Sequence, residues 1–185
     1  MGALFSGTVG PAPAVVLLVL AVTCAVTDLW KGKIYNAITY PAMALGLVLS
    51  VWLHGVSGIF LALGGFAVGF FPAFIMFALG GMAGGDVKLL GAIGTIAGAV
   101  AATETLILAF VVGGLLSLGK LAWHGQLFSS LWRSLRVIVG SLWPGFAPAK
   151  RPDGERLTIR FGFSICVALL ATLWDLRSGA LSSLL

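Results

Sequence analysis

The feature that most constrains this chain is the recurrence of long apolar segments along nearly its whole length. We identify about six, each long enough or nearly long enough to cross a hydrocarbon core of roughly 30 Å as a helix. They cover approximately residues 12–28, 37–53, 58–79, 87–102, 104–123 and 158–176. Hydrophobic residues make up 59% of the 185 and charged residues only 9%, so no soluble core could bury this much apolar surface. The sequence therefore predicts an all-α, polytopic transmembrane bundle of about six helices, with the lipid bilayer as its solvent.

Glycines inside the apolar segments recur at a spacing that suits close helix packing. Gly65 with Gly69, and Gly94 with Gly98, repeat at intervals of four residues. Such pairs let two helix backbones approach each other in lipid. The fourth segment is also short and rich in Gly and Ala, so we expect it to lie inside the bundle.

The longest polar stretch lies between the fifth and sixth segments, at about 124–157. Within it, apolar residues recur at helical spacing over about 127–142, with Ser and Arg residues largely between them. This pattern is typical of an amphipathic helix that lies in the membrane surface. We therefore expect a single membrane domain over residues 1–185, in which residues 124–157 form a cytoplasmic loop containing one interfacial helix.

The basic residues indicate which side of the membrane faces the cytoplasm. Ten of the eleven Lys and Arg residues lie on one side of the six-segment prediction, and only Arg177 lies on the other. Because cytoplasmic loops are enriched in Lys and Arg, we expect both termini outside the cytoplasm. The formal net charge of +5 has the same explanation, so it does not indicate a nucleic-acid partner.

Two acidic residues lie at the membrane boundary. Asp28 ends the first segment and Asp86 precedes the fourth. Two crossings separate them, so both belong to the same face of the bundle, which the basic residues make cytoplasmic. Asp86 could merely cap a helix, and Asp28 could merely mark the water boundary. However, an anion at a helix C-terminus is disfavoured by the helix dipole, and ionisable groups at membrane depth are costly, so both residues carry a functional hypothesis.

A pair of neighbouring carboxyl groups is compatible with more than one class of function. In an aspartic protease, one carboxylate draws a proton from water while its protonated partner hydrogen-bonds the scissile carbonyl. A small proton-coupled membrane transporter would also use intramembrane carboxyl groups. A structural component of a secretion or pilus assembly system would need neither residue for chemistry. The carboxyl groups by themselves leave these alternatives open.

Other catalytic arrangements find no support in the sequence. His54 and His124 are isolated, and no HExxH motif is present. Cys24 and Cys166 lie inside apolar segments and form no CxxC pair. We therefore expect no metal site and no cofactor. No GxSxG motif is present, which leaves a serine protease unsupported.

Two stretches of the chain carry a resemblance to a known family. Residues 81–90 read GMAGGDVKLL, which resembles the GxGD motif of membrane aspartic proteases and, with its continuation, the type IV prepilin peptidases. Residues 28–36 read DLWKGKIYN and resemble the family's D-x5-IPN pattern. Ala83 stands where GxGD has its first Gly, and Tyr35 stands where the family often has Pro. The resemblance covers roughly residues 12–123.

This resemblance implies an intramembrane aspartic endopeptidase with Asp28 and Asp86 as its catalytic residues. Gly84, Gly85 and Lys88 match further positions of the motif. For Lys88 two roles stay open, contact with lipid phosphates or an electrostatic effect near the site.

The resemblance also implies the substrate and the location. It implies removal of the leader peptide from prepilins or pseudopilins at the cytoplasmic face of the bacterial inner membrane. Larger members carry an insert with paired CxxC motifs and methyltransferase activity, and this chain has neither CxxC pair. It resembles the short stand-alone form associated with tight-adherence (Flp-type) pili. The oligomeric state is left open.

Overall fold

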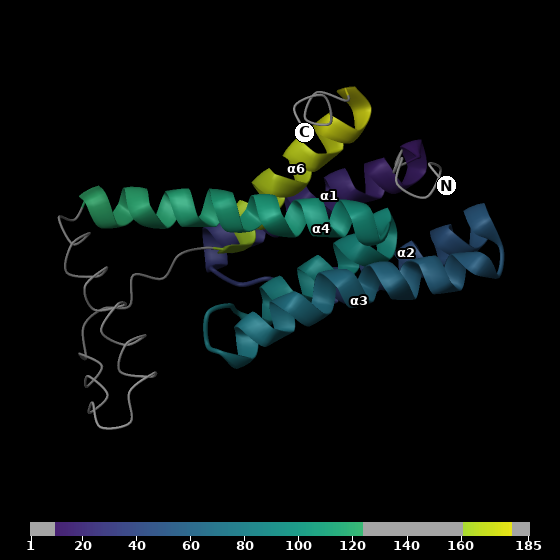
Figure 1. Ribbon diagram of the computed structural model, residues 1–185, viewed down its shortest axis with the longest axis horizontal. Helices are drawn as coiled ribbons and strands as arrows, with labels where there is room; N and C mark the ends of the chain where they lie inside the picture. Colours follow the sequence, from purple (N-terminus) through teal and green to yellow (C-terminus); the bar gives the residue numbers. More distant parts are fainter. Residues whose placement is uncertain (1–9, 124–160, 179–185) are drawn as a thin grey trace. The chain divides into compact units, whose positions relative to one another are not determined.

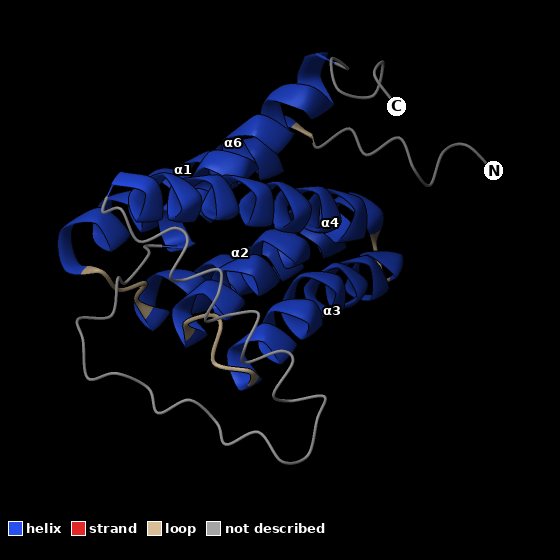
Figure 2. Cartoon of the chain, turned by 60° about the vertical axis from the view of Figure 1, so that its left-hand side comes forward, coloured by secondary structure: helices blue, strands red, loops and turns tan. Residues whose placement is uncertain are grey.

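The described part of the chain consists of helices joined by short turns. A computed structural model describes residues 10–123 and 161–178 (Figure 1). In chain order the helices are α1 (Pro11–Lys31), α2 (Asn36–His54), α3 (Ser57–Ala78), α4 (Gly84–Trp123) and α6 (Phe161–Ser178). These two ranges contain no strand (Figure 2). The all-α class is therefore confirmed.

The apolar character of the helices supports a membrane protein. Helices α1, α2, α3 and α4 are long and apolar enough to cross a membrane, whereas the apolar part of α6, Phe161–Asp175, is shorter. The predicted number of about six transmembrane helices is not confirmed, because the described residues form five helices. The fourth and fifth predicted segments correspond to two helical parts that are counted together as α4 and are separated by the non-helical residue Gly98.

Helix α4 is interrupted by a sharp kink at Gly98. This residue has φ 84° and ψ 178°, a conformation that is essentially restricted to glycine. In Figure 1 the teal beginning of α4 and its continuation beyond the kink run in different directions. The predicted segments placed the break between two helices near residue 103, but it lies at Gly98. Gly98 had been expected to provide a helix packing contact, and in the structure it forms the bend. We call residues 84–97 the first arm and residues 99–112 the second arm.

The described residues fall into two compact units. One contains α1, α2, α3, both arms of α4, and α6, and the other contains the remainder of α4 from Gly113. Within the first unit, α1 packs against α6 and α2, and α2 packs against α3. The residues of the candidate site all belong to the first unit.

The first arm lies at the centre of this unit, as its Gly and Ala content indicates. Residues 89–96 are all buried. A Cβ atom added to Gly65 would collide with the carbonyl oxygen of Gly94, and one added to Gly69 would collide with that of Leu90. The two glycines of α3 therefore allow direct backbone contact with the first arm, which confirms the packing expected from their spacing.

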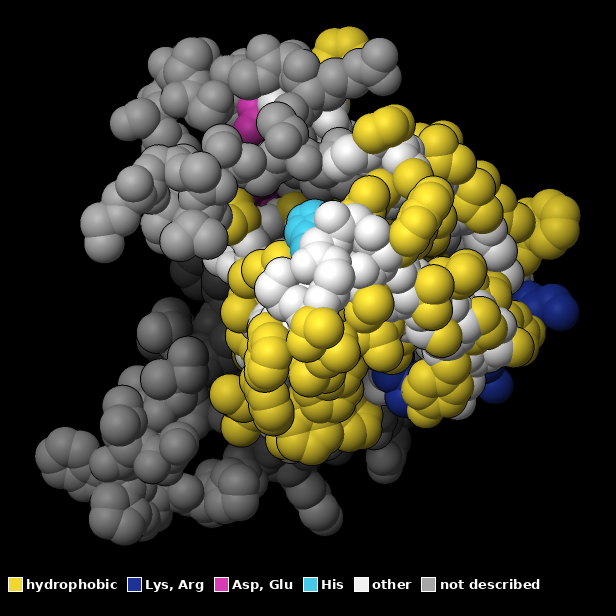
Figure 3. All heavy atoms as spheres, turned by 90° about the vertical axis from the view of Figure 1, so that its right-hand side faces the viewer, with side chains coloured by type: hydrophobic (Ala, Val, Ile, Leu, Met, Phe, Trp, Pro, Cys, Tyr) yellow, Lys and Arg dark blue, Asp and Glu magenta, His cyan; other side chains and the backbone are white. Residues whose placement is uncertain are grey.

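The outward surface of the helices is largely apolar. Trp52 is 78% exposed, Phe60 is 74% exposed and Leu79 is 76% exposed. Hydrophobic side chains cover much of the described part of the face drawn in Figure 3. Such a surface would be costly in water and suits lipid tails.

Two expectations lie outside the described residues. These are the polar stretch at 124–157 and the amphipathic helix at 127–142. The single-domain organisation of residues 1–185 also stays a prediction.

Candidate active site

Asp28 is held in the last turn of α1 with its side chain buried. The residue is 5% exposed, and α1 ends three residues later at Lys31. Gly32 closes the helix with φ 62°, and its N–H donates to the main-chain oxygen of Asp28 at 2.9 Å. The carboxyl group accepts a hydrogen bond from the backbone N–H of Phe163, which lies 2.9 Å from Asp28 Oδ2. The side chain of Asp28 is thus fixed against the start of α6.

Asp86 lies in the first turn of α4 and is also 5% exposed. Its N–H donates to the carbonyl oxygen of Ala83 at 3.1 Å, which forms the turn that opens the helix. No described residue other than glycine has a positive φ, so the backbone at Ala83 does not require the glycine of the GxGD pattern. The carboxyl group is therefore attached at the start of a helix, where the helix dipole is positive.

The surroundings of the two predicted aspartates have a residue in common. Ile34, in the turn before α2, connects their surroundings. A Cβ atom added to Gly85 would lie 3.1 Å from Ile34 Cβ, and one added to Gly162 would lie 2.8 Å from Ile34 Cδ1 and 2.9 Å from Asp28 Oδ2. The end of α1, the start of α4 and the start of α6 therefore converge on the two carboxyl groups.

Lys88 joins the two sequence motifs directly. Its Nζ donates to Asn36 Oδ1 at 2.9 Å and lies 5.1 Å from the centre of the Tyr40 ring. Asn36 is the last residue of the first motif, and Lys88 follows Asp86 by two residues in the second. The hydrogen bond ties the start of α4 to the start of α2, a partner that the sequence did not reveal.

Comparison with known proteins agrees with this arrangement of motifs. The sequence profile of the type IV leader peptidase family matches residues 15–118, more than half of the chain. The chain belongs to the type IV leader peptidase family. Neither a curated protein nor a solved structure matches it. The matched residues include both motifs and exclude α6.

Membership of this family implies a membrane-embedded peptidase whose substrates are prepilins. The recognition made from the two motifs is thereby confirmed. The described part of the chain also has four helices suited to a bilayer, in agreement with an enzyme that works within a membrane.

The two motif glycines of this leader peptidase differ in how tightly they are packed. A Cβ atom on Gly85 would lie 3.3 Å from the Ile34 carbonyl oxygen, closer than ordinary contact, so this position has little room for a side chain. A Cβ atom on Gly84 would lie 3.6 Å from the ring of Phe77, which is ordinary contact. Gly85 is therefore the more demanding of the two positions.

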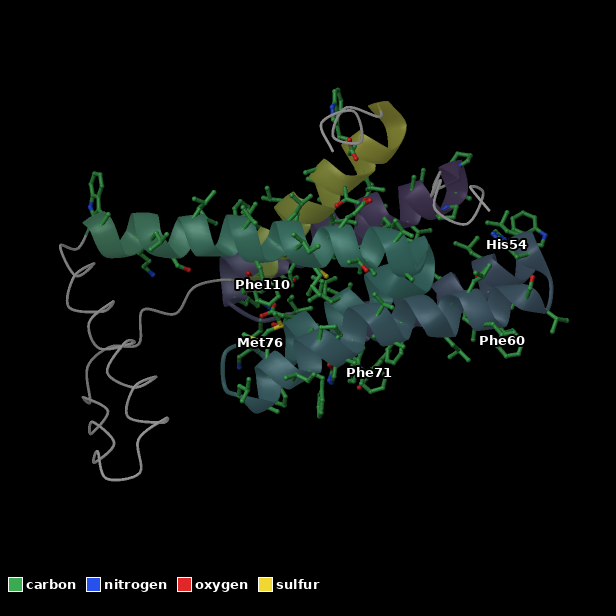
Figure 4. The ribbon with its side chains drawn as sticks, viewed as in Figure 1. His54, Phe60, Phe71, Met76 and Phe110 are labelled. Carbon is green, nitrogen blue, oxygen red and sulfur yellow. The ribbon has the colours of Figure 1, made fainter. Side chains whose placement is uncertain are left out.

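Within residues 10–123 and 161–178, the other reactive side chains do not meet the requirements of a metal site. Among the described residues, no three His, Cys, Asp or Glu side chains are grouped so that they could hold a metal ion. His54 lies beside Phe60 at one end of the α2–α3 pair, and Met76 lies at the other (Figure 4). The start of α4 follows the Met76 end, so His54 is remote from the candidate site.

Sequence reasoning missed the contribution of α6. Gly162 and the Phe163 N–H touch Asp28, although both lie far from the two motifs in the chain. No local pattern marks them, since Gly162 is one of 26 glycines. Only the packing of α6 against α1 reveals the contact.

Proposed function

We propose that this leader peptidase is an aspartic endopeptidase in which Asp28 and Asp86 together activate water. The observation that carries the proposal is the burial of both carboxyl groups at helix ends that have Ile34 as a common neighbour. Two neighbouring carboxyl groups do not both ionise readily, so a single proton is shared between them. That is the arrangement an aspartic protease requires.

The shared proton gives the two residues complementary tasks. The ionised carboxylate takes a proton from water, and the water oxygen attacks the carbonyl carbon of the scissile peptide. The protonated partner hydrogen-bonds the carbonyl oxygen. When the carbon–nitrogen bond breaks, a carboxyl proton passes to the leaving amine. Asp28 Oδ2 already accepts the Phe163 N–H, so a proton held by Asp28 would be on Oδ1.

The proposed substrate is the leader peptide of a Flp-type prepilin, cleaved at the cytoplasmic face of the bacterial inner membrane. Exposed Lys31 and Lys33 follow Asp28 directly, and half-buried Lys88 follows Asp86. A cluster of basic residues next to both carboxyl groups supports a cytoplasmic location, because basic residues are retained on that side. The absence of a CxxC pair in the sequence supports the short form without methyltransferase activity.

The test is processing of a Flp-type prepilin coexpressed with the full chain. Asp28→Asn and Asp86→Asn keep the size of each side chain and remove its acid–base function. Each should abolish the processed band, because neither task can be performed by an amide. Glu104→Gln, a carboxyl group elsewhere on α4, is the matched control and should process normally.

Membrane levels of all variants are measured by immunoblotting, so that a lost band is not confused with a lost protein. Normal processing by either Asp variant would refute the dyad.

A further inference from the structure

The start of α6 contacts Asp28 through a backbone donor. Phe163 is the third residue of α6, and its N–H lies 2.9 Å from Asp28 Oδ2. The first four N–H groups of a helix have no acceptor within the helix, so this donor is free to bind a side chain. The contact resembles a helix cap, except that the carboxyl group comes from α1, 135 residues earlier in the chain.

Gly162 makes this contact possible because it leaves space beside the carboxyl group. A Cβ atom at this position would lie 2.9 Å from Asp28 Oδ2 and 3.0 Å from its Cγ, where ordinary contact begins at 3.4 Å. Gly162 is buried and does not have a positive φ. Its backbone conformation is therefore open to other residues, and the lack of space next to Asp28 is what requires glycine.

Helix α6 is held in place along its length. The rings of Phe161 and Phe110 are 5.4 Å apart near the start of α6, and Phe110 is labelled in Figure 4. Further along, the buried Thr105 hydroxyl donates to the Thr172 hydroxyl at 3.3 Å. These contacts fix α6 to the second arm of α4, so the Phe163 N–H is a preorganised donor.

We propose that the start of α6 positions Asp28 for catalysis, with Gly162 as a positioning residue. The Phe163 N–H keeps Oδ2 as an acceptor and orients the carboxyl group, so that Oδ1 is the oxygen that exchanges the shared proton. This inference rests on the proposed function of Asp28. It assigns a role to a helix that lies beyond residues 15–118, the part matched by the family profile.

The first test compares Gly162→Ala with Gly64→Ala in the purified full-length enzyme, with a Flp-type prepilin as substrate. The added methyl group at 162 must displace Asp28 Oδ2 by about 0.5 Å, the difference between 3.4 and 2.9 Å. Since a 1 Å misplacement can cost about 100-fold, we expect kcat to fall about tenfold with KM little changed. A Cβ atom on Gly64 meets nothing within 4 Å, so that variant should keep the parental kcat.

A double variant separates displacement of Asp28 from simple crowding. Ile34→Val deletes the Cδ1 atom, which lies 2.8 Å from the added Cβ and is its nearest neighbour. If crowding against Ile34 caused the loss, Gly162→Ala/Ile34→Val would recover the kcat of Ile34→Val alone. We expect no recovery, because the clash with the carboxyl group persists.

A second pair of variants tests the donor itself and does not depend on how well Gly162→Ala folds. Phe163→Pro removes the N–H, and proline is tolerated in the first turn of a helix. Phe163→Ala removes the same ring and retains the N–H. We expect kcat of Phe163→Pro to be about tenfold below that of Phe163→Ala.

Equal kcat values within this pair, or recovery in the Ile34→Val double variant, would overturn the positioning role. Asp28→Asn and Asp86→Asn are assayed beside them. If those two are inactive while Phe163→Pro is as active as Phe163→Ala, the positioning role fails and the proposed function stands. If either Asp variant cleaves normally, the proposed function itself fails.

Discussion

Replacing Gly65 by alanine should push α3 away from the first arm of α4. The added Cβ atom would collide with the Gly94 carbonyl oxygen, and it would lie 2.8 Å from the Gly94 carbonyl carbon and 3.0 Å from that of Gly98. All three are backbone atoms, which cannot rotate out of the way as a side chain can. Ordinary contact begins at 3.4 Å, so the helices must separate by at least about 0.6 Å, the difference from 2.8 Å.

The size of the effect follows from two opposing contributions. Overpacking a well-packed core costs about 1–3 kcal/mol. Alanine is favoured over glycine inside a helix by roughly 0.5–1 kcal/mol. We therefore expect Gly65→Ala to lower the free energy of unfolding by about 1 kcal/mol, and by at most about 2.5 kcal/mol. The neighbouring variant Gly64→Ala adds the same atom where nothing lies within 4 Å, so it should be neutral or slightly stabilising.

The assay is reversible unfolding in mixed micelles, with helix content followed by circular dichroism during titration with a denaturing detergent. Prepilin cleavage is measured on the same preparations. Because Asp86 opens the arm that Gly65 contacts, cleavage should fall in Gly65→Ala and not in Gly64→Ala. The packing argument is refuted if the two variants unfold at the same detergent concentration.

Two further predictions concern the start and the bend of α4. In a double-mutant cycle, Lys88→Met and Asn36→Ala should show a coupling of about 0.5–1.5 kcal/mol in unfolding free energy, because their hydrogen bond joins α4 to α2. Zero coupling would instead favour the role of Lys88 at lipid phosphates. Gly98→Ala should lower the free energy of unfolding by about 1–3 kcal/mol relative to Gly114→Ala, because Gly98 has a positive φ and Gly114 does not. Equal melting temperatures of these two variants would show that the bend does not need glycine.

The sequence predicted the first three helices closely. Segments 12–28, 37–53 and 58–79 correspond to Pro11–Lys31, Asn36–His54 and Ser57–Ala78. These helices could be predicted from the sequence because each apolar run is ended by polar or turn-forming residues. In α4 the predicted segments 87–102 and 104–123 meet near residue 103, whereas the backbone bends at Gly98. Hydropathy does not encode which glycine adopts a positive φ, so the position of the bend could not be predicted.

The candidate site was predictable to a similar extent. Counting two crossings between Asp28 and Asp86 predicted that they lie on one face of the bundle, and in the structure Ile34 lies next to the surroundings of both residues. The Lys88–Asn36 hydrogen bond joins residues that the two motifs had already marked, but their distance in sequence hides the contact. The contact of α6 with Asp28 depends on three-dimensional packing and had no signal in the chain.

In the proposed dyad, we expect the carboxyl group of Asp28 to depend on its contact with α6 more than that of Asp86 does. The reason is the position of each residue at a helix end. Asp86 lies in the first turn of α4, where the helix dipole already favours an anion. Asp28 lies in the last turn of α1, where the dipole of its own helix opposes one. The start of α6 supplies the opposite sign and donates the Phe163 N–H at this point, so it offsets the unfavourable end of α1. We therefore expect the proposed pairing of Asp28 with Asp86 to require that α6 is packed beside α1.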